Sequence, residues 1–170
     1  ITITSSSTSS SKKKKKKKNK LQVVTYLVEN YWNATVTINR NGNLPIHIAC
    51  GNKAGLKIID YLATVSPDSL KRQTTGTGLT PLHVACQVKA SLKVISYLVG
   101  QWKDALQIPT HETGQYPIHV ACQKKSSLAV IQFLVRRWPE CLKKLDGNGK
   151  TPAEAACCNN DDANNNNDNT

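Results

Sequence analysis

The stretch TGLTPLHVAC, from Thr77 to Cys86, decides the fold because close copies of it recur along the chain. The copies are NGNLPIHIAC from Asn41, TGQYPIHVAC from Thr113 and NGKTPAEAAC from Asn148. Their prolines follow one another at intervals of 36, 36 and 35 residues. Self-similarity at a fixed period of about 20–50 residues indicates a repeat protein. We therefore treat the chain as an array of repeats before considering any single motif.

A second recurring block follows each of the first three copies and has the pattern of an amphipathic helix. These blocks begin at Leu56, Leu92 and Leu128, and the segment LQVVTYLVEN from Leu21 is a fourth copy of them. Their apolar residues form a broad face, which is typical of a helix packed between neighbours. In TGLTPLHVAC and its copies, proline occupies the first helical position, and the glycine three residues earlier suits a tight turn. Each unit is therefore predicted to form two helices, and stacked units bury one continuous core.

The predicted fold class is all-α, a solenoid of helix pairs joined by short turns. We expect the array to span residues 20–158 as a half repeat, three full repeats and a final half repeat. Residues 1–19 contain a Ser/Thr tract and a lysine run, residues 159–170 are rich in asparagine, and both compositions are typical of disordered segments. The lysine run stands where a first helix should precede Leu21, and the array stops after one helix of its fourth unit. Because no methionine occurs in the chain, position 1 included, we expect a fragment of a longer protein.

These units resemble the ankyrin repeat. The sequence TPLHVAC of the second copy is similar to the T-P-L-H-x-A-A signature of that family, and SLKVISYLV is similar to its second helix. The resemblance covers about residues 21–158. The period of 36 exceeds the usual value of about 33, because one extra residue lies between the helices and a short added turn begins at Pro67, Lys103 and Pro139. Cysteine replaces the second alanine in all four copies, and Glu154 replaces the histidine in the last.

The resemblance implies a protein-interaction scaffold or adaptor that binds through the turn tips and the exposed side of the first helices, without catalysis or a cofactor. The residues expected at this surface differ between copies while the framework repeats. They are Arg40, Asn41, Asn43, Asn52, Thr77, Leu79, Gln87, Val88, Glu112, Thr113, Gln115, Gln123 and Lys124. We expect one or more protein partners, including acidic ones, a cytoplasmic or nuclear location, and a monomer.

Recurring histidine and cysteine residues raise the question of a zinc site. His47, His83 and His119 each precede a cysteine by three residues, and residues at that spacing share a face of a helix. Zinc–ligand bonds are about 2.0–2.3 Å long, whereas equivalent positions of stacked helices lie about 8–10 Å apart. This spacing argues against a shared metal and against disulfides between repeats. The resemblance makes each histidine structural, with a hydrogen bond near the turn that ties one repeat to the next. We expect buried, reduced cysteines, with Cys141 in an added turn more exposed.

Nothing in the chain has the pattern of an active site. It contains no recognisable nucleophile–base–acid set, no phosphate-binding loop and no recurring pair of carboxylates. We therefore expect no catalysis by this segment. No stretch reaches the roughly 18 apolar residues of a membrane span. An enzyme or membrane part outside this segment, with the repeats as its regulatory arm, is a further alternative.

The net charge of +12 suggests a nucleic-acid-binding protein, but eight of these charges come from Lys12 to Lys18 and Lys20, which leaves +4 for the rest. A lysine run of this length can act as a nuclear localisation signal or a phosphate-binding patch. The alternative function is therefore a nuclear or nucleic-acid-associated regulatory protein. No aromatic residue is interleaved with the lysines, so base stacking has no support, and nucleic acid is the less favoured partner.

Two further columns of residues each have two interpretations. Lys53, Lys89 and Lys125 lie between the two helices of successive units. We favour a role at the helix C-terminus, through the helix dipole, over a basic stripe that meets an acidic partner. Trp102 and Trp138 occupy matching positions after the second helix, and we favour packing between repeats over a binding hot spot.

Overall fold

The computed structural model describes residues 9–157, without the side chains of residues 9–19 and Trp32. Within this range the chain forms eight α-helices and four short 3-10 helices, and no strand. The predicted all-α class is therefore confirmed. The expectations for residues 1–8 and for the asparagine-rich tail, residues 159–170, lie outside the described residues.

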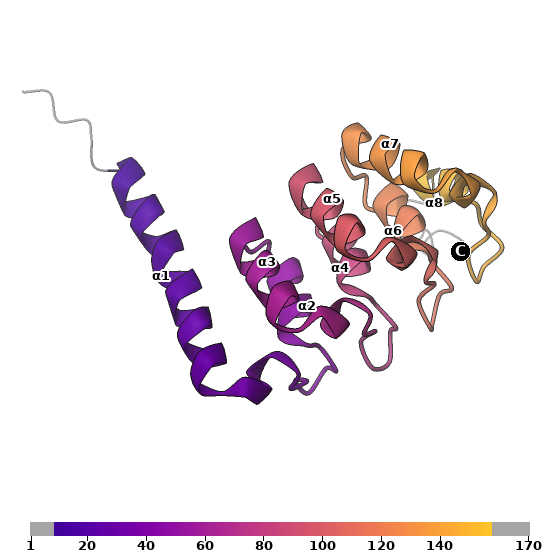
Figure 1. Ribbon diagram of the computed structural model, residues 1–170. Helices are drawn as coiled ribbons and strands as arrows, with labels where there is room; N and C mark the ends of the chain where they lie inside the picture. Colours follow the sequence, from indigo (N-terminus) through magenta and orange to yellow (C-terminus); the bar gives the residue numbers. More distant parts are fainter. Residues whose placement is uncertain (1–8, 158–170) are drawn as a thin grey trace, which may run out of the picture.

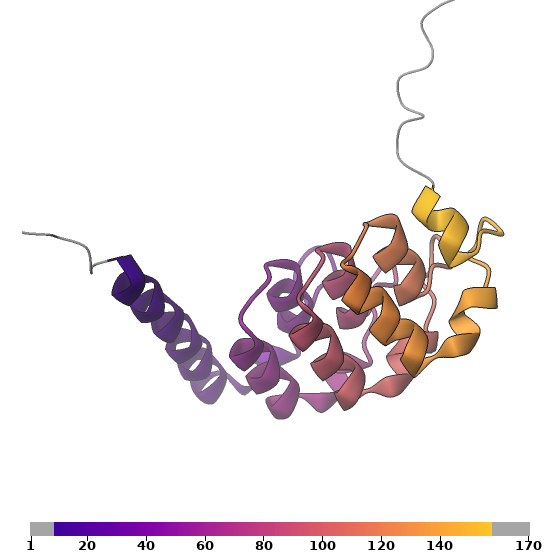
Figure 2. The same cartoon turned by 90° about the horizontal axis from the view of Figure 1, so that it is seen from above.

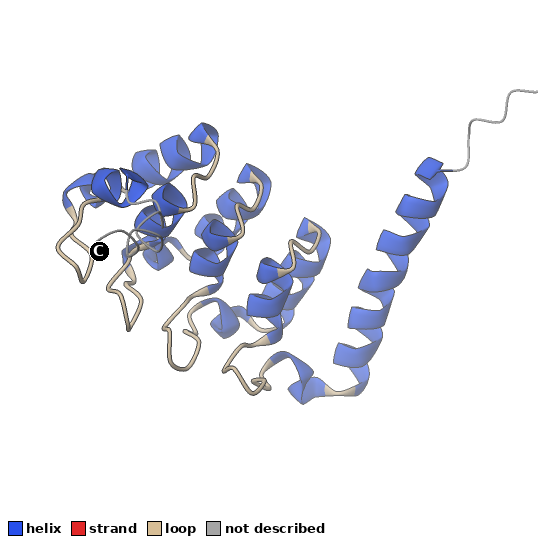
Figure 3. Cartoon of the chain, turned by 180° about the vertical axis from the view of Figure 1, so that it is seen from behind, coloured by secondary structure: helices blue, strands red, loops and turns tan. Residues whose placement is uncertain are grey.

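The helices alternate between an inner and an outer layer, and successive pairs stack side by side (Figure 1). The inner helices are α2 (Pro45–Gly51), α4 (Pro81–Gln87), α6 (Pro117–Gln123) and α8 (Pro152–Cys157). The outer helices are α1 (Ser9–Asn30), α3 (Leu56–Val65), α5 (Leu92–Gln101) and α7 (Leu128–Arg137). Long loops precede the inner helices and gather at one edge of the array (Figure 3). Each inner helix begins at a proline, as the sequence predicts.

The added turns form 3-10 helices that contribute to the core. They are η2 (Pro67–Leu70), η3 (Lys103–Gln107) and η4 (Pro139–Lys143), and η1 (Trp32–Thr35) occupies the equivalent place after α1. Leu70 and Leu106 are buried at the ends of the outer helices, so the extra residues of the 36-residue period enlarge the apolar interior.

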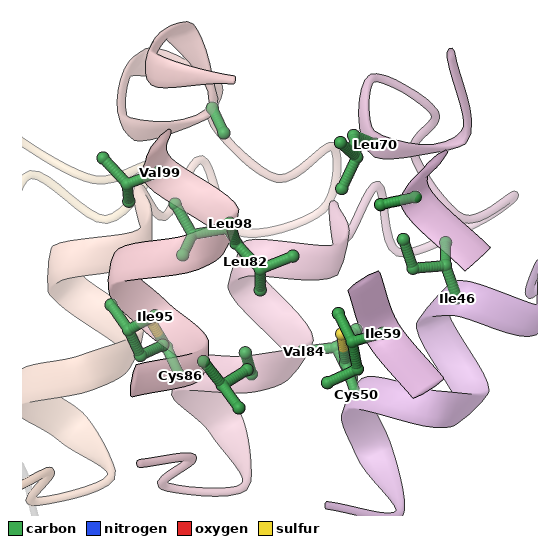
Figure 4. Packing of buried hydrophobic residues seen from close by; sticks show 14 of the residues in the cluster. Ile46, Cys50, Ile59, Leu70, Leu82, Val84, Cys86, Ile95, Leu98 and Val99 are labelled. Atoms are coloured by element: carbon green, nitrogen blue, oxygen red, sulfur yellow. The ribbon is translucent and has the colours of Figure 1, made fainter. Parts of the chain in front are cut away.

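The core lies between the two layers and is built from the same columns in each unit (Figure 4). The inner helices present small residues, among which Ala85, Cys50 and Cys86 are completely buried. The outer helices contribute larger side chains, such as Ile59 and Ile95. Small residues on the inner helices allow neighbouring backbones to approach closely, while the larger outer side chains fill the space between the layers.

The cysteines within the described residues are free thiols. Burial raises the pKa of Cys50 and of Cys86 to about 12, so these thiols remain protonated at neutral pH. Cys141 is also buried, and the prediction that it is more exposed was wrong. In η4 its backbone N–H donates to the carbonyl oxygen of Trp138, at 3.1 Å. Residues three apart in a 3-10 helix lie on one side, so Cys141 faces the core together with Trp138.

Helix α1 differs from the domain boundary that the sequence suggests. The array is predicted to begin at residue 20, whereas α1 begins at Ser9 and includes Lys12 to Lys18. Lysine is a good helix former, and the packed segment from Leu21 supplies the nucleus from which the helix extends. Helix propagation therefore outweighs the repulsion between like charges along the run. Figure 2 shows α1 at one end of the stack, with its N-terminal half pointing away from the other helices.

Three lysines at matching positions cap the C-terminal ends of the inner helices α2, α4 and α6. Lys53, Lys89 and Lys125 have φ angles of 49°, 54° and 54°, in the left-handed region. The N–H of Ala90 donates to the carbonyl oxygen of Ala85 at 2.9 Å, which is the 6→1 hydrogen bond of a Schellman motif. The interpretation of these lysines as helix-terminal residues agrees with this geometry, and a basic stripe stays a prediction.

Candidate protein-binding groove

Each long loop is a hairpin that is held by one polar side chain at its start. The Thr74 hydroxyl accepts the backbone N–H of Leu79 at 2.9 Å and lies 2.8 Å from the Thr77 hydroxyl. Thr110 does the same in the next hairpin, where it accepts the N–H of Gln115 at 3.0 Å. The sequence analysis missed this position, although a polar residue six or seven places before each proline recurs in every copy and could have indicated it.

Neighbouring hairpins are joined through their backbones. The N–H of His111 donates to the carbonyl oxygen of Thr77 at 3.1 Å, and the N–H of Gly147 donates to that of Thr113 at 2.9 Å. The Gln73 amide adds a second link, because its Nε2 donates to the carbonyl oxygens of Gly78 at 2.7 Å and of Pro109 at 3.0 Å. The second, third and fourth hairpins therefore form a continuous row instead of separate loops.

The three histidines connect each unit to the next, as the resemblance implies. His83 Nδ1 accepts the backbone N–H of Thr80 at 3.2 Å, so its Nε2 carries the proton and donates to the carbonyl oxygen of Gln115 at 3.0 Å. In the same way His47 donates to the carbonyl oxygen of Arg72 and His119 to those of Lys144 and Lys150, while the Nδ1 of each accepts the backbone N–H three residues earlier. Burial lowers the pKa of His83 to about 4, so the neutral form is maintained at physiological pH. These histidine hydrogen bonds hold the hairpin of one unit against the inner helix of the previous one.

Between the row of hairpins and the inner helices lies a groove of about 360 Å³. It spans the first two full units and is lined by side chains from both hairpins and from the ends of α2 and α4. Six of the thirteen predicted binding residues line it. They are Asn41, Asn43, Asn52, Thr77, Leu79 and Gln87. Ile48 and Val84 form part of its floor, so amide and hydroxyl groups surround an apolar strip. Such a lining can hydrogen-bond an extended backbone while it contacts apolar side chains.

The other seven predicted residues do not line this groove, but none of them is buried. Arg40 lies at the first hairpin, whereas Glu112, Thr113 and Gln115 belong to the third. Val88, Gln123 and Lys124 lie at the C-terminal ends of α4 and α6. Because the units are equivalent, these residues of the third hairpin and of α4 and α6 lie along the same edge of the array as the groove. The carbonyl oxygen of Gln115 is occupied by His83, so the backbone of this residue has a structural role.

The tryptophans that the structure describes are packing residues. Trp102 and Trp138 are partly buried against the core. The ring of Trp138 also contacts that of Tyr116 edge-on, with centroids 5.3 Å apart. This favours the packing interpretation over a binding hot spot.

Among residues 9–157, no cluster of three or more His, Cys, Asp or Glu side chains is placed to hold a metal ion. Nor does any helix in that range have the length and apolar composition needed to cross a membrane.

Comparison with known protein families agrees with the geometry of the hairpins and helix pairs. A family model described as ankyrin repeats, in three copies, matches residues 15–107, which is more than half of the chain. No curated protein matches the chain.

Proposed function

The chain belongs to the ankyrin repeat family, and from this premise we propose that it is a scaffold or adaptor that binds partner proteins through its hairpin tips and inner-helix face, without catalysis. Ankyrin repeats are in general protein-interaction modules. The observation that carries the proposal is the groove between the first two full units, because six residues chosen from the sequence as binding residues converge on it. The mechanism is docking onto a rigid surface.

Rigidity of this surface follows from the bonds that hold it. The second hairpin, which lines the groove, is joined backbone to backbone to the third at 3.1 Å, and His47 anchors its start to α2 through the carbonyl oxygen of Arg72, at 3.1 Å. A preformed groove loses little conformational entropy when a partner binds, so more of the contact energy contributes to affinity. Partners with an extended segment that carries both amide groups and apolar side chains fit this lining. The exposed Lys53 and Lys89 beside the inner helices favour acidic residues in the flanks of that segment.

The test removes the polar groups of the groove and follows the partners of the protein. Tagged wild-type protein is compared in affinity capture with a variant that carries Asn41→Ala, Asn43→Ala, Thr77→Ala and Gln87→Ala. We expect specific partners to be lost, because several polar contacts disappear at once. If the quadruple variant keeps every partner, the proposed groove is wrong.

The matched control carries four alanine substitutions on the exposed surface of the outer helices. These are Thr64→Ala, Lys93→Ala, Gln101→Ala and Gln132→Ala, and all four positions are exposed. This control should keep the partners that the groove variant loses. Equal thermal unfolding of both variants shows that the loss does not arise from unfolding.

The lysine run supports a second candidate function, as a nuclear or nucleic-acid-associated protein. Because α1 includes Lys12 to Lys18, the run lies on a helix that projects from one end of the array. Phosphate neutralisation by several lysines would make affinity fall steeply with salt. Deletion of residues 12–20 should abolish nuclear import and salt-sensitive binding to duplex DNA. If neither changes, this candidate fails, whatever the outcome for the groove.

A further inference from the structure

An apolar cavity lies at the other end of the array from α8, between α1 and the first helix pair. Its volume is about 670 Å³, and it is lined by Val24, Leu27 and Val28 of α1, by Ile48 of α2 and by Ile58 of α3. Lys20 is the one charged residue in the lining. No contact within the described residues covers this surface, so it forms an open apolar groove.

The groove lies where an inner helix would pack on α1 and beside α2, and no helix within the described residues fills this place. Leu27 is 45% exposed, whereas the equivalent residues of the next two outer helices, Leu62 and Leu98, are 5% and 2% exposed. Ile48 is 41% exposed, whereas Val84 at the same place in the next inner helix is 9% exposed. In the interior of the array, an inner helix on the N-terminal side buries these columns. A helix of the same kind would therefore fit this groove.

The opposite end of the array presents such a helix without its outer partner. Stacking of α8 on α6 buries Pro152 and Ala155 but leaves Ala153 and Cys157 exposed. The residue equivalent to Ala153 in α4 is Leu82, which is 2% exposed because the outer helix and the next inner helix cover it. Within residues 9–157, α8 is thus an inner helix without an outer one, and α1 is an outer helix without an inner one. Together they make one complete repeat.

Charge also favours this pairing. The inner and outer helices of a unit are antiparallel and joined by a short turn (Figure 1), so the C-terminal end of an inner helix lies beside the N-terminal end of its outer helix. By sequence, residues 158–170 contain three aspartates and no lysine or arginine, whereas the residues before Leu21 contain eight lysines. The opposite signs of these charges favour association between the two ends of the array.

We propose that two copies of this chain associate head to tail, with α8 of one copy seated in the groove beside α1 of the next. The contact is heterologous, since the two copies use different surfaces, so each added copy leaves one groove and one α8 free and the assembly can grow. The apolar groove shares Ile48 and Asn52 with the binding groove at the hairpins, and its other lining residues are separate. This association differs from the monomer that the sequence suggests.

One residue weakens this contact relative to a repeat interface within the chain. Glu154 stands in the column of His83, and its carboxylate accepts the N–H and hydroxyl of Thr151 at 2.6 and 2.7 Å. It cannot donate the hydrogen bond that His83 gives to the following unit. Reversible association is therefore expected instead of a permanent assembly, and Glu154→His should tighten it several-fold.

The test uses sedimentation velocity of the full 170-residue chain over roughly 1–100 μM, the range of a weak reversible contact. The wild type should sediment faster as its concentration rises. Ile48→Glu blocks the groove, and Ala153→Arg blocks α8 with a bulky charged side chain on the surface that would face α1. Both substitutions lie at exposed positions, so the fold should persist. Each variant alone should stay monomeric, with association weakened at least tenfold.

Mixing the two blocked variants gives the decisive result. The Ile48→Glu copy keeps its α8 and the Ala153→Arg copy keeps its groove, so an equimolar mixture should form a dimer and nothing larger. Leu92→Glu is the matched control, because Leu92 is 39% exposed in the middle of the array, and it should associate like the wild type. A wild type that stays monomeric, or a mixture without dimers, overturns the proposal. A symmetric dimer that survives either substitution overturns it as well.

Discussion

The second hairpin offers two glycines that separate backbone strain from hairpin stacking. Gly76 and Gly78 have φ angles of 87° and 72°, so an alanine at either position is strained. A Cβ on Gly76 would meet nothing within 4 Å, whereas a Cβ on Gly78 would lie 2.4 Å from the backbone nitrogen of His111. Substitution by alanine therefore measures backbone strain alone at Gly76, and backbone strain together with the contact between hairpins at Gly78.

The expected magnitudes follow from these contacts. Gly76→Ala should lower the free energy of unfolding by about 1 kcal/mol, the cost of a left-handed conformation for a residue with a Cβ. Gly78→Ala incurs the same cost and also forces the third hairpin away. This breaks the 3.1 Å hydrogen bond from His111 to Thr77 and leaves its groups poorly paired. Such a loss adds about 1–3 kcal/mol, so Gly78→Ala should destabilise the protein by about 3 kcal/mol.

Urea unfolding followed by far-ultraviolet circular dichroism measures both values. With a slope of about 2 kcal/mol per molar urea, the midpoint should fall by about 0.5 M for Gly76→Ala and by about 1.5 M for Gly78→Ala. Equal midpoints for the two variants would refute the stacking of the hairpins. A change in slope for Gly78→Ala alone would show that the array unfolds in separate parts.

Three further predictions concern single side chains. The pKa of His83 falls from 6.5 to about 4 on folding, so between these pH values the unfolded chain binds a proton that the folded protein does not. The contribution of His83 to the free energy of unfolding is therefore complete above pH 6.5 and declines by up to about 3 kcal/mol towards pH 4. Urea unfolding at several pH values should show that the free energy of unfolding depends less steeply on pH for His83→Gln than for the wild type, and an unchanged pH dependence contradicts the hydrogen-bonding role of His83. Lys89→Gly should raise the free energy of unfolding by about 0.5–1 kcal/mol in the same assay, because glycine adopts the φ of 54° without strain, and Lys89→Ala as control should bring no such gain. Iodoacetamide should label the exposed Cys157 in the native protein and Cys86 only after unfolding, as measured by peptide mass spectrometry; rapid native labelling of Cys86 would contradict its burial.

The hairpin edge shows how far the sequence could identify the site. The turn tips were recognisable from glycine and proline at constant spacing, and Asn41, Thr77 and Leu79 do lie at the groove. The Thr74 and Thr110 positions were missed although a polar residue recurs there in every copy, because which backbone N–H each hydroxyl accepts depends on the folded loop. Which of the predicted residues face one common hollow likewise depends on the stacking of two units.

Repetition is what the sequence by itself determined. Period, proline position and apolar pattern were sufficient for the helix pairs, their order and the buried cysteine column, because each depends on residues within one unit and its neighbours, while the resemblance to ankyrin repeats supplied the structural role of the histidines. The two ends of the array required the tertiary structure. Only the structure shows that the lysine run continues α1 and that Leu27 and Ile48 are largely exposed, because no other helix within residues 9–157 packs on them. The pattern within a unit predicts which side chains face inward, but only the packed array shows whether another helix covers them.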